Sequence, residues 1–204
     1  MTVRGPGRPR DPDLDDRILQ VTRHHLATNG YDAMSVVAIA EEAGTTRQAL
    51  YRRWPSKADL ATAAIAAMAR ADERPPTDDA YLDLVAELEA FRRGINRPDG
   101  ISMVGTMLLD STDEELVDLY RERLVTPRRE RFREILERAR TERLLDDHAD
   151  IEVALNMLTG AWYANALTGG PPVKRWAQRV AALTWRSLGG DHQLARGPVT
   201  RPGS

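Results

Sequence analysis

Two short helical patterns joined through one glycine constrain the fold of this chain more than any other feature of its sequence. Ser35 can cap a helix whose apolar positions recur three and four residues apart, and Gly44 ends that helix because glycine accepts a positive φ at no steric cost. A second helix, over Arg47 to Arg53, begins at once behind Thr45 or Thr46. Two short helices around such a turn are typical of the helix-turn-helix, whose second helix enters a major groove of DNA.

Helical spacing extends over the rest of the chain. A first helix from about Pro12 to Thr28 can be capped by Asp11 and stopped by Asn29-Gly30. The chain offers no convincing alternation of apolar and polar residues, which a half-buried strand requires. We therefore expect an all-α fold of about nine helices, with the others near residues 56–71, 81–95, 102–109, 114–143 (bent at Pro127), 151–167 and 173–188.

Composition and charge narrow the class of protein. The net charge is -2, but basic residues gather in the first ten positions and over residues 47–57, which favours nucleic acid as a partner of the N-terminal end. The absence of cysteine excludes disulfides and thiolate chemistry. Because no apolar run has the length of a signal peptide core or a membrane span, we expect a cytoplasmic protein with no membrane partner.

The proline-rich segment Arg74 to Thr77 is the clearest linker in the sequence and predicts a domain boundary near residue 74. We expect a helix-turn-helix domain over residues 13–73 and a second helical domain over residues 74–190. A flexible basic arm over residues 1–12 precedes them in this interpretation, and a disordered tail over residues 191–204 follows them.

A motif of more than twenty residues, from Val37 to Lys57, covers both short helices. Its distinctive elements at fixed spacing are Ile39-Ala40, Ala43-Gly44, Leu50-Tyr51 and Trp54-Pro55-Ser56-Lys57. In these elements the chain resembles the TetR family of bacterial transcriptional regulators over about residues 13–70. The resemblance implies a homodimeric DNA-binding repressor that a small-molecule ligand releases from its operator.

The resemblance also implies which residues contact DNA. Thr46, Arg47, Gln48 and Tyr51 are expected to face the groove, and the phosphate contacts are assigned to Ser35, Tyr51, Arg52 and Lys57, with Thr45 beside them. Arginine can pair with guanine O6 and N7, glutamine with adenine N6 and N7, and lysine with phosphate. Gln48, Arg53 and Trp54 depart from the small residue, histidine and phenylalanine that are common in the family.

The N-terminal arm contains Gly7-Arg8-Pro9-Arg10, which is similar to the core of an AT-hook. Extended arginines flanked by proline fit a narrow minor groove, so Arg8 and Arg10 are candidate DNA contacts. A flexible solvated arm without DNA contact is the alternative.

The second domain is the candidate sensor of a ligand. Its apolar and aromatic residues predict a pocket between helices, oriented by Thr106 and Asn156. The candidate lining residues are Phe91, Met103, Thr106, Met107, Phe132, Leu136, Asn156, Met157, Trp162 and Tyr163. Ordinary core packing is the alternative for each of them. Asn156 is expected to be buried and to need a hydrogen-bond partner.

The last two helices carry more apolar surface than one small domain readily covers. The family resemblance implies that they pair across a two-fold axis into a four-helix bundle and present two recognition helices to a palindromic operator. The candidate interface residues are Leu155, Trp162, Ala166, Trp176, Val180, Leu183, Thr184 and Leu188.

Two other classes of protein are alternatives to a regulator. An enzyme is disfavoured because the four histidines have no metal-ligand spacing and no P-loop, nucleophile elbow or dinucleotide fingerprint is present, so we expect no catalytic residue, metal or cofactor. The other rival is a helical small-molecule-binding or scaffold protein that has a helix-turn-helix fold but no specific operator. Sequence-selective, salt-dependent DNA binding distinguishes the regulator from that scaffold.

Overall fold

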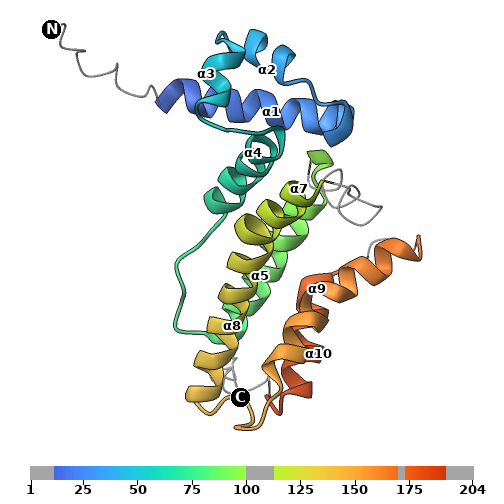
Figure 1. The fold of residues 1–204 in the computed structure, drawn as a ribbon. Coiled ribbons are helices and arrows are strands. Elements are labelled where there is room, and N and C mark those ends of the chain that lie inside the picture. Colours follow the sequence, from blue (N-terminus) through green and yellow to red (C-terminus); the bar gives the residue numbers. More distant parts are fainter. Residues whose placement is uncertain (1–11, 100–112, 170–172, 192–204) are drawn as a thin grey trace, which may run out of the picture. The chain divides into compact units, whose positions relative to one another are not determined.

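The computed structural model describes residues 12–99, 113–169 and 173–191, and every regular element within them is a helix (Figure 1). The predicted all-α fold is confirmed. Residues in contact form two compact units, one of residues up to 68 with 97–123 and the other of residues 69–96 with 124 onwards. Residues 97–123 are thus grouped with the first unit, although the boundary predicted near residue 74 places them in the second domain.

The first unit begins with α1, Pro12–Ala33, whose regular backbone is broken at Gly30, where φ is 75°. The Asn29-Gly30 stop predicted from the sequence thus lies at a real break. Three helices follow: α2 is Val36–Glu42, α3 is Arg47–Tyr51 and α4 is Lys57–Ala71. The apolar core beneath them is fully buried and consists of Ile18, Leu26, Ile39, Leu50 and Leu60.

The single helix predicted over residues 114–143 is divided into three parts. Helix α7, Glu114–Tyr120, is followed by a π-helical turn, η1, Arg121–Val125, and then by α8, Thr126–Thr141. Pro127 lies in the first turn of α8. Since proline has no backbone N–H and clashes with the carbonyl four residues earlier, the regular α-helical bonding cannot continue through Arg123. The bend predicted at Pro127 thus lies close to the observed break, but the π-helical form of the break was not predicted.

The second unit consists of α5 (Ala80–Ile95), α8, α9 (Ile151–Leu167) and α10 (Trp176–Ser187). Helix α5 packs beside both α8 and α10, and α9 packs against α8 and α10 (Figure 1). The bounds predicted for α9 are those observed. The side chains between the helices form a dense apolar core that includes Leu84, Leu88, Phe91, Phe132, Leu136, Leu155, Leu158, Trp176 and Trp185.

Candidate nucleic-acid interface

Side-chain caps fix the two short helices. The Ser35 hydroxyl accepts a hydrogen bond from Ala38 N at 3.3 Å, and the Thr46 hydroxyl accepts one from Ala49 N at 3.1 Å. Gly44 between them has φ of 70°, in the left-handed region that side chains with a Cβ rarely adopt. These three features are the ones that the sequence predicted for the turn. Helix α3 ends at Tyr51, two residues earlier than expected.

The solvent face of α3 carries the side chains predicted to contact bases. Thr46, Arg47 and Gln48 are exposed, whereas Leu50 on the opposite face is fully buried. The Arg47 guanidinium carbon lies 5.2 Å from the centre of the Tyr51 ring, a cation–π distance. A short helix anchored by one leucine therefore presents an arginine, a glutamine and a tyrosine to solvent from consecutive turns.

Donors suited to phosphate surround this helix. Lys57 Nζ donates to the carbonyl of Asp32 at 2.9 Å and lies 4.7 Å from the centre of the Tyr31 ring. These contacts hold the ammonium near the start of α4, where backbone N–H groups also favour an anion. Ser35 and Arg52 are exposed, and the Ser35 hydroxyl hydrogen remains able to donate.

The remaining predicted DNA contacts divide into two cases. Thr45 is half-buried in the turn, and its backbone N donates to the Ala40 carbonyl at 2.8 Å. Arg8 and Arg10 lie outside the described residues.

Polar contacts that the sequence analysis did not predict hold α2 and α3 on α1. Arg53 Nε donates to Asp15 Oδ1 at 2.5 Å, and its Nη1 donates to the Ala49 carbonyl at 3.1 Å. Arg17 Nε donates to the Ala43 carbonyl at the end of α2. The one sequence signal for these contacts was Arg53 itself, which stands where histidine is common in the family.

Helix α7 is tied to the same unit. Tyr31 Oη donates to Asp113 Oδ2 at 2.6 Å, while Asp113 Oδ1 accepts from Leu116 N and caps α7. Burial, together with the hydrogen bond to Asp113, raises the pKa of Tyr31 well above its ordinary value. Tyr31 therefore contacts Lys57 through its ring and, through its hydroxyl, Asp113 at the start of α7, which lies 82 positions further along the chain.

The π-helical turn contributes one further contact to α4. Arg123 Nη1 donates to the Asp59 carbonyl at 3.0 Å and to Thr62 Oγ1 at 3.1 Å, and Arg123 Nη2 pairs with the Asp59 carboxylate. Thr62 and Asp59 are both buried. Removing one member of such a partly buried pair would leave the other charge poorly solvated, so the pair is costly to break. Through this pair and the bond to Thr62, Arg123 fixes the first two turns of α4.

The residues predicted to line a pocket have three different environments. Phe91, Phe132 and Leu136 are buried in the core of the second unit, and Phe91 packs edge-on against the half-buried Trp162 and Tyr163 at 6.3 and 6.1 Å. Met157 is exposed. The other three methionine and threonine candidates, Met103, Thr106 and Met107, lie outside the described residues.

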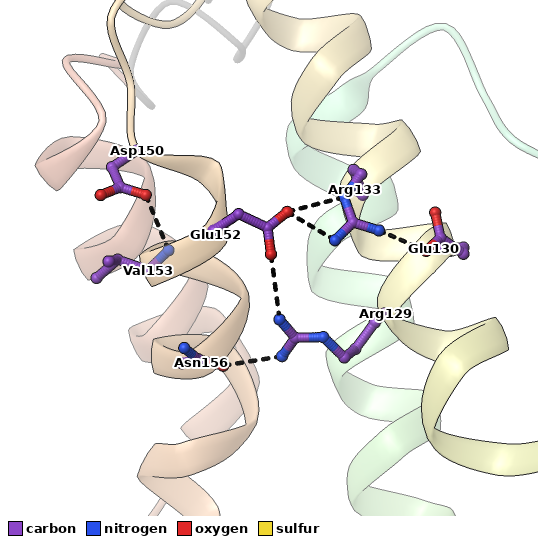
Figure 2. A network of polar contacts seen from close by, with 7 residues as sticks. All are labelled: Arg129, Glu130, Arg133, Asp150, Glu152, Val153 and Asn156. Carbon is purple, nitrogen blue, oxygen red and sulfur yellow. Dashed lines mark hydrogen bonds and ion pairs between the residues drawn. The ribbon is translucent and has the colours of Figure 1, made fainter. Parts of the chain in front are cut away.

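Asn156 is exposed, so the expectation that it is buried was wrong. It does have a partner: its Oδ1 accepts from Arg129 Nη1 at 2.8 Å (Figure 2). Glu152, one turn earlier on α9, pairs with Arg129 at 3.4 Å and with Arg133 at 2.6 Å. Figure 2 shows these side chains bridging α8 and α9, which makes Asn156 part of a surface ion-pair network.

The predicted interface residues are also divided by burial. Leu155, Trp176, Thr184 and Leu188 are buried within the chain itself, where their side chains belong to the core. Trp162 and Val180 are half-buried. Ala166 and Leu183 are exposed, and Leu183 retains 59% of its accessible surface.

Metal binding and membrane insertion are two other functions that helical proteins can have. Among the residues whose placement is known, no group of three or more histidine, aspartate or glutamate side chains could hold a metal ion. None of the helices in those same segments is long and apolar enough to cross a membrane.

The capped pair α2 and α3, with an exposed arginine and glutamine on α3, defines a helix-turn-helix DNA-binding protein. Residues 18–64 match the family described as bacterial regulatory proteins, tetR family, and residues 74–184 match the tetracyclin repressor-like C-terminal domain. The chain belongs to the TetR family of transcriptional regulators.

Known proteins similar to this chain are regulators of the same type. An uncharacterised helix-turn-helix transcriptional regulator of Bacillus subtilis, YdeS, is 29% identical over 170 residues, which is 82% of this chain and 85% of that protein. Another, Mb1581 of Mycobacterium bovis, is 32% identical over 65% of this chain and 67% of its own length.

Solved structures give the same fold. The TetR family regulator SCO0332 superposes with a TM-score of 0.69 at 26% identity and covers 86% of this chain and 98% of its own. A TetR regulator from Agrobacterium tumefaciens superposes with a TM-score of 0.71 over 91% of this chain and 98% of its own, at 16% identity.

Proposed function

We propose that this regulator is a homodimeric repressor, which binds a palindromic operator through α3 and leaves it when a small molecule binds the second unit. The observation that carries the DNA-binding part is the exposed face of α3. The side chains of Arg47 and Gln48 make no ion pair or hydrogen bond with the rest of the described chain, so their donor groups are available to base edges.

An exposed apolar stripe on α9 supports self-association. Val153 is 53% exposed, Met157 42% and Leu167 81%, and the small residues Ala161 and Ala164 lie between them at helical spacing. A stripe of large and small apolar side chains on one helix face suits close packing against a second helix. We assign the dimer face to this stripe together with Leu183 of α10.

The continuity of α4 supports release by a ligand. This helix begins at Lys57, beside the proposed phosphate contact, and ends at Ala71, three residues inside the second unit. A ligand that binds one position of α4 more tightly than another shifts the population of the DNA-binding geometry. Such a shift of α4 would alter the contact between Arg123 and Asp59 and the hydrogen bond from Lys57 to the Asp32 carbonyl.

The experiment that tests the DNA-binding part is selection of bound duplexes from a random library, followed by affinity measurements at one fixed salt concentration. We expect a palindromic consensus for the wild type. Arg47→Ala and Gln48→Ala are each expected to relax the preference at one position per half-site by about 1–3 kcal/mol. A library that yields no consensus favours the alternative of a helical protein without a specific operator.

Analytical ultracentrifugation tests the dimer face with a matched pair of leucines. Leu183 on α10 and Leu82 on α5 are 59% and 58% exposed, but only Leu183 lies on the proposed face. Leu183→Asp should shift the protein toward monomer, and Leu82→Asp should leave the dimer intact. The opposite result places the interface elsewhere.

A further inference from the structure

A hollow of about 220 Å³ lies in the second unit between α5, α8 and the segment that follows α4. It is separate from the aromatic core, because Phe91, Phe132 and Leu136 do not line it. The floor is made by small or compact apolar residues, Ala86 and Ala90 of α5 and Ile135 of α8, and the segment after α4 contributes Pro75 and Pro76. A cavity of this kind accepts the apolar body of a small organic molecule.

Ion pairs hold the walls of the hollow in place. Arg131 pairs with Glu87 at 3.0 Å and with Glu73 at 2.9 Å. Arg138 pairs with Asp83 at 2.5 Å and donates to the Thr77 carbonyl at 3.0 Å. These contacts connect α8 both to α5 and to the segment after α4 and so hold the walls of the hollow together.

Two of the four arginines that line the hollow have no such partner. The side chains of Arg74 and Arg93 are exposed and make no ion pair or hydrogen bond with the described residues, whereas the lining acids Asp72, Asp83 and Glu87 are engaged. Glu134 is the one lining carboxylate left without a partner in that part of the chain. Four arginines and four carboxylates line the hollow, so its lining has no net charge, but Arg74 and Arg93 are the guanidinium groups whose donors remain available to an anionic group of a ligand.

We infer that the hollow binds a small organic monoanion with an apolar body, such as an aryl or alkyl carboxylate or sulfonate. The apolar part lies on Ala86, Ala90 and Ile135, and the anionic group is bound by Arg74 and Arg93. A charge-assisted hydrogen bond to guanidinium is the strongest contact available to such a group. The inference deepens the proposed function, because an anion bound in the hollow would restrain the segment that follows α4. Only this regulatory consequence rests on the proposed function; the binding of the anion itself does not.

The test uses two probes that differ in one charge. The fluorescent sulfonate 1-anilinonaphthalene-8-sulfonate has an apolar body and a single negative charge, and N-phenyl-1-naphthylamine has the same body without the sulfonate. We expect the wild type to bind one sulfonate probe per chain at this site, about tenfold more tightly than the neutral amine.

Four variants locate the binding. Arg74→Gln with Arg93→Gln should weaken the sulfonate probe about tenfold and leave the neutral probe within about twofold. Ala90→Leu fills the floor and should weaken both probes. Arg92→Gln is the matched control, since Arg92 is an exposed neighbour that does not line the hollow. Leu183→Asp controls for probe bound to the apolar face of α9 and α10.

Equal affinity for the two probes, or sulfonate binding that survives the double glutamine variant, overturns the inference. Loss of binding in Leu183→Asp but not in Ala90→Leu also overturns it. If circular dichroism shows that Ala90→Leu does not fold, the affinity of the Arg74→Gln and Arg93→Gln double variant for the two probes is the deciding measurement, since both substituted residues are exposed. Operator binding measured without any probe tests the proposed function separately, so the two can fail independently.

Discussion

Arg53 donates from Nε to Asp15 Oδ1 at 2.5 Å, which ties the residue just past α3 to the first turn of α1. The two side chains are only 12% and 30% exposed, so the pair is partly shielded from water. Arg53 Nη1 also donates to the Ala49 carbonyl at 3.1 Å. The orientation of the five-residue recognition helix is therefore set by a charged contact outside the helix itself.

Breaking this pair should weaken operator binding by changing the orientation of α3. Asp15→Asn removes the charge and is expected to lower the unfolding free energy by about 1–2 kcal/mol. Operator affinity should fall more than nonspecific affinity, because the basic side chains remain while their placement changes. A loss that is equal on operator and random duplex contradicts a positioning role.

Substitution of Gly44 should destabilise the turn through the backbone alone. A Cβ added there meets nothing within 4 Å, but φ is +70°. Gly44→Ala is expected to lower the unfolding free energy by about 1 kcal/mol, measured by urea unfolding. Gly94 also has open space but lies within α5, so Gly94→Ala should raise stability by about 0.5–1 kcal/mol. Destabilisation of similar size in both variants would refute the account of the turn.

Lys57 and Arg47 should differ in how they affect salt dependence. Lys57→Gln removes the proposed phosphate contact and is expected to weaken binding to all duplexes, with the slope of log affinity against log salt reduced by about 1. Arg47→Ala should chiefly reduce discrimination between operator and mutated operator. Salt titrations of both variants on two duplexes separate the roles, and interchange of the two results would show that the assignment is reversed.

Acid should weaken the attachment of the segment after α4 through Asp83. Burial raises the pKa of this carboxyl, but hydrogen bonds from Arg138 and Thr77 outweigh burial and hold the pKa below its ordinary value. A lowered folded-state pKa contributes stability that is present above the unfolded value near 4 and is lost as pH falls through the folded value.

Asp83→Asn tests this dependence. The variant should lose about 1–3 kcal/mol of unfolding free energy at neutral pH and show a shallower decline below about pH 4 than the wild type. Urea unfolding from pH 7 to pH 3 measures both quantities. Parallel pH curves for the two proteins would mean that Asp83 contributes nothing to acid sensitivity.

Local features of the helix-turn-helix could be predicted from sequence because each depends on neighbouring residues. The Ser35 and Thr46 caps and the positive φ of Gly44 involve contacts within three or four positions. The hydrogen bond between Tyr31 and Asp113 could not be predicted, because the two residues are 82 positions apart and no periodicity relates them.

The faces of α9 and α10 were harder to predict for a different reason. Helix α9 is apolar on nearly every side, so its pattern does not indicate which face is inward. Leu155 lies in the core, whereas Val153, Met157 and Asn156 face solvent. Packing against α5, α8 and α10 decided the orientation, and that information is absent from the sequence of α9 alone.

The most direct test of the central claim is the ratio of affinities for the selected operator and a scrambled duplex of equal length, measured at about 0.15 M salt. A specific regulator is expected to bind its operator about a thousandfold or more tightly than the scrambled duplex. Arg47→Ala combined with Gln48→Ala should reduce that ratio while leaving most of the nonspecific affinity. Wild-type protein that binds both duplexes equally would contradict the assignment of α3 as a sequence-reading helix.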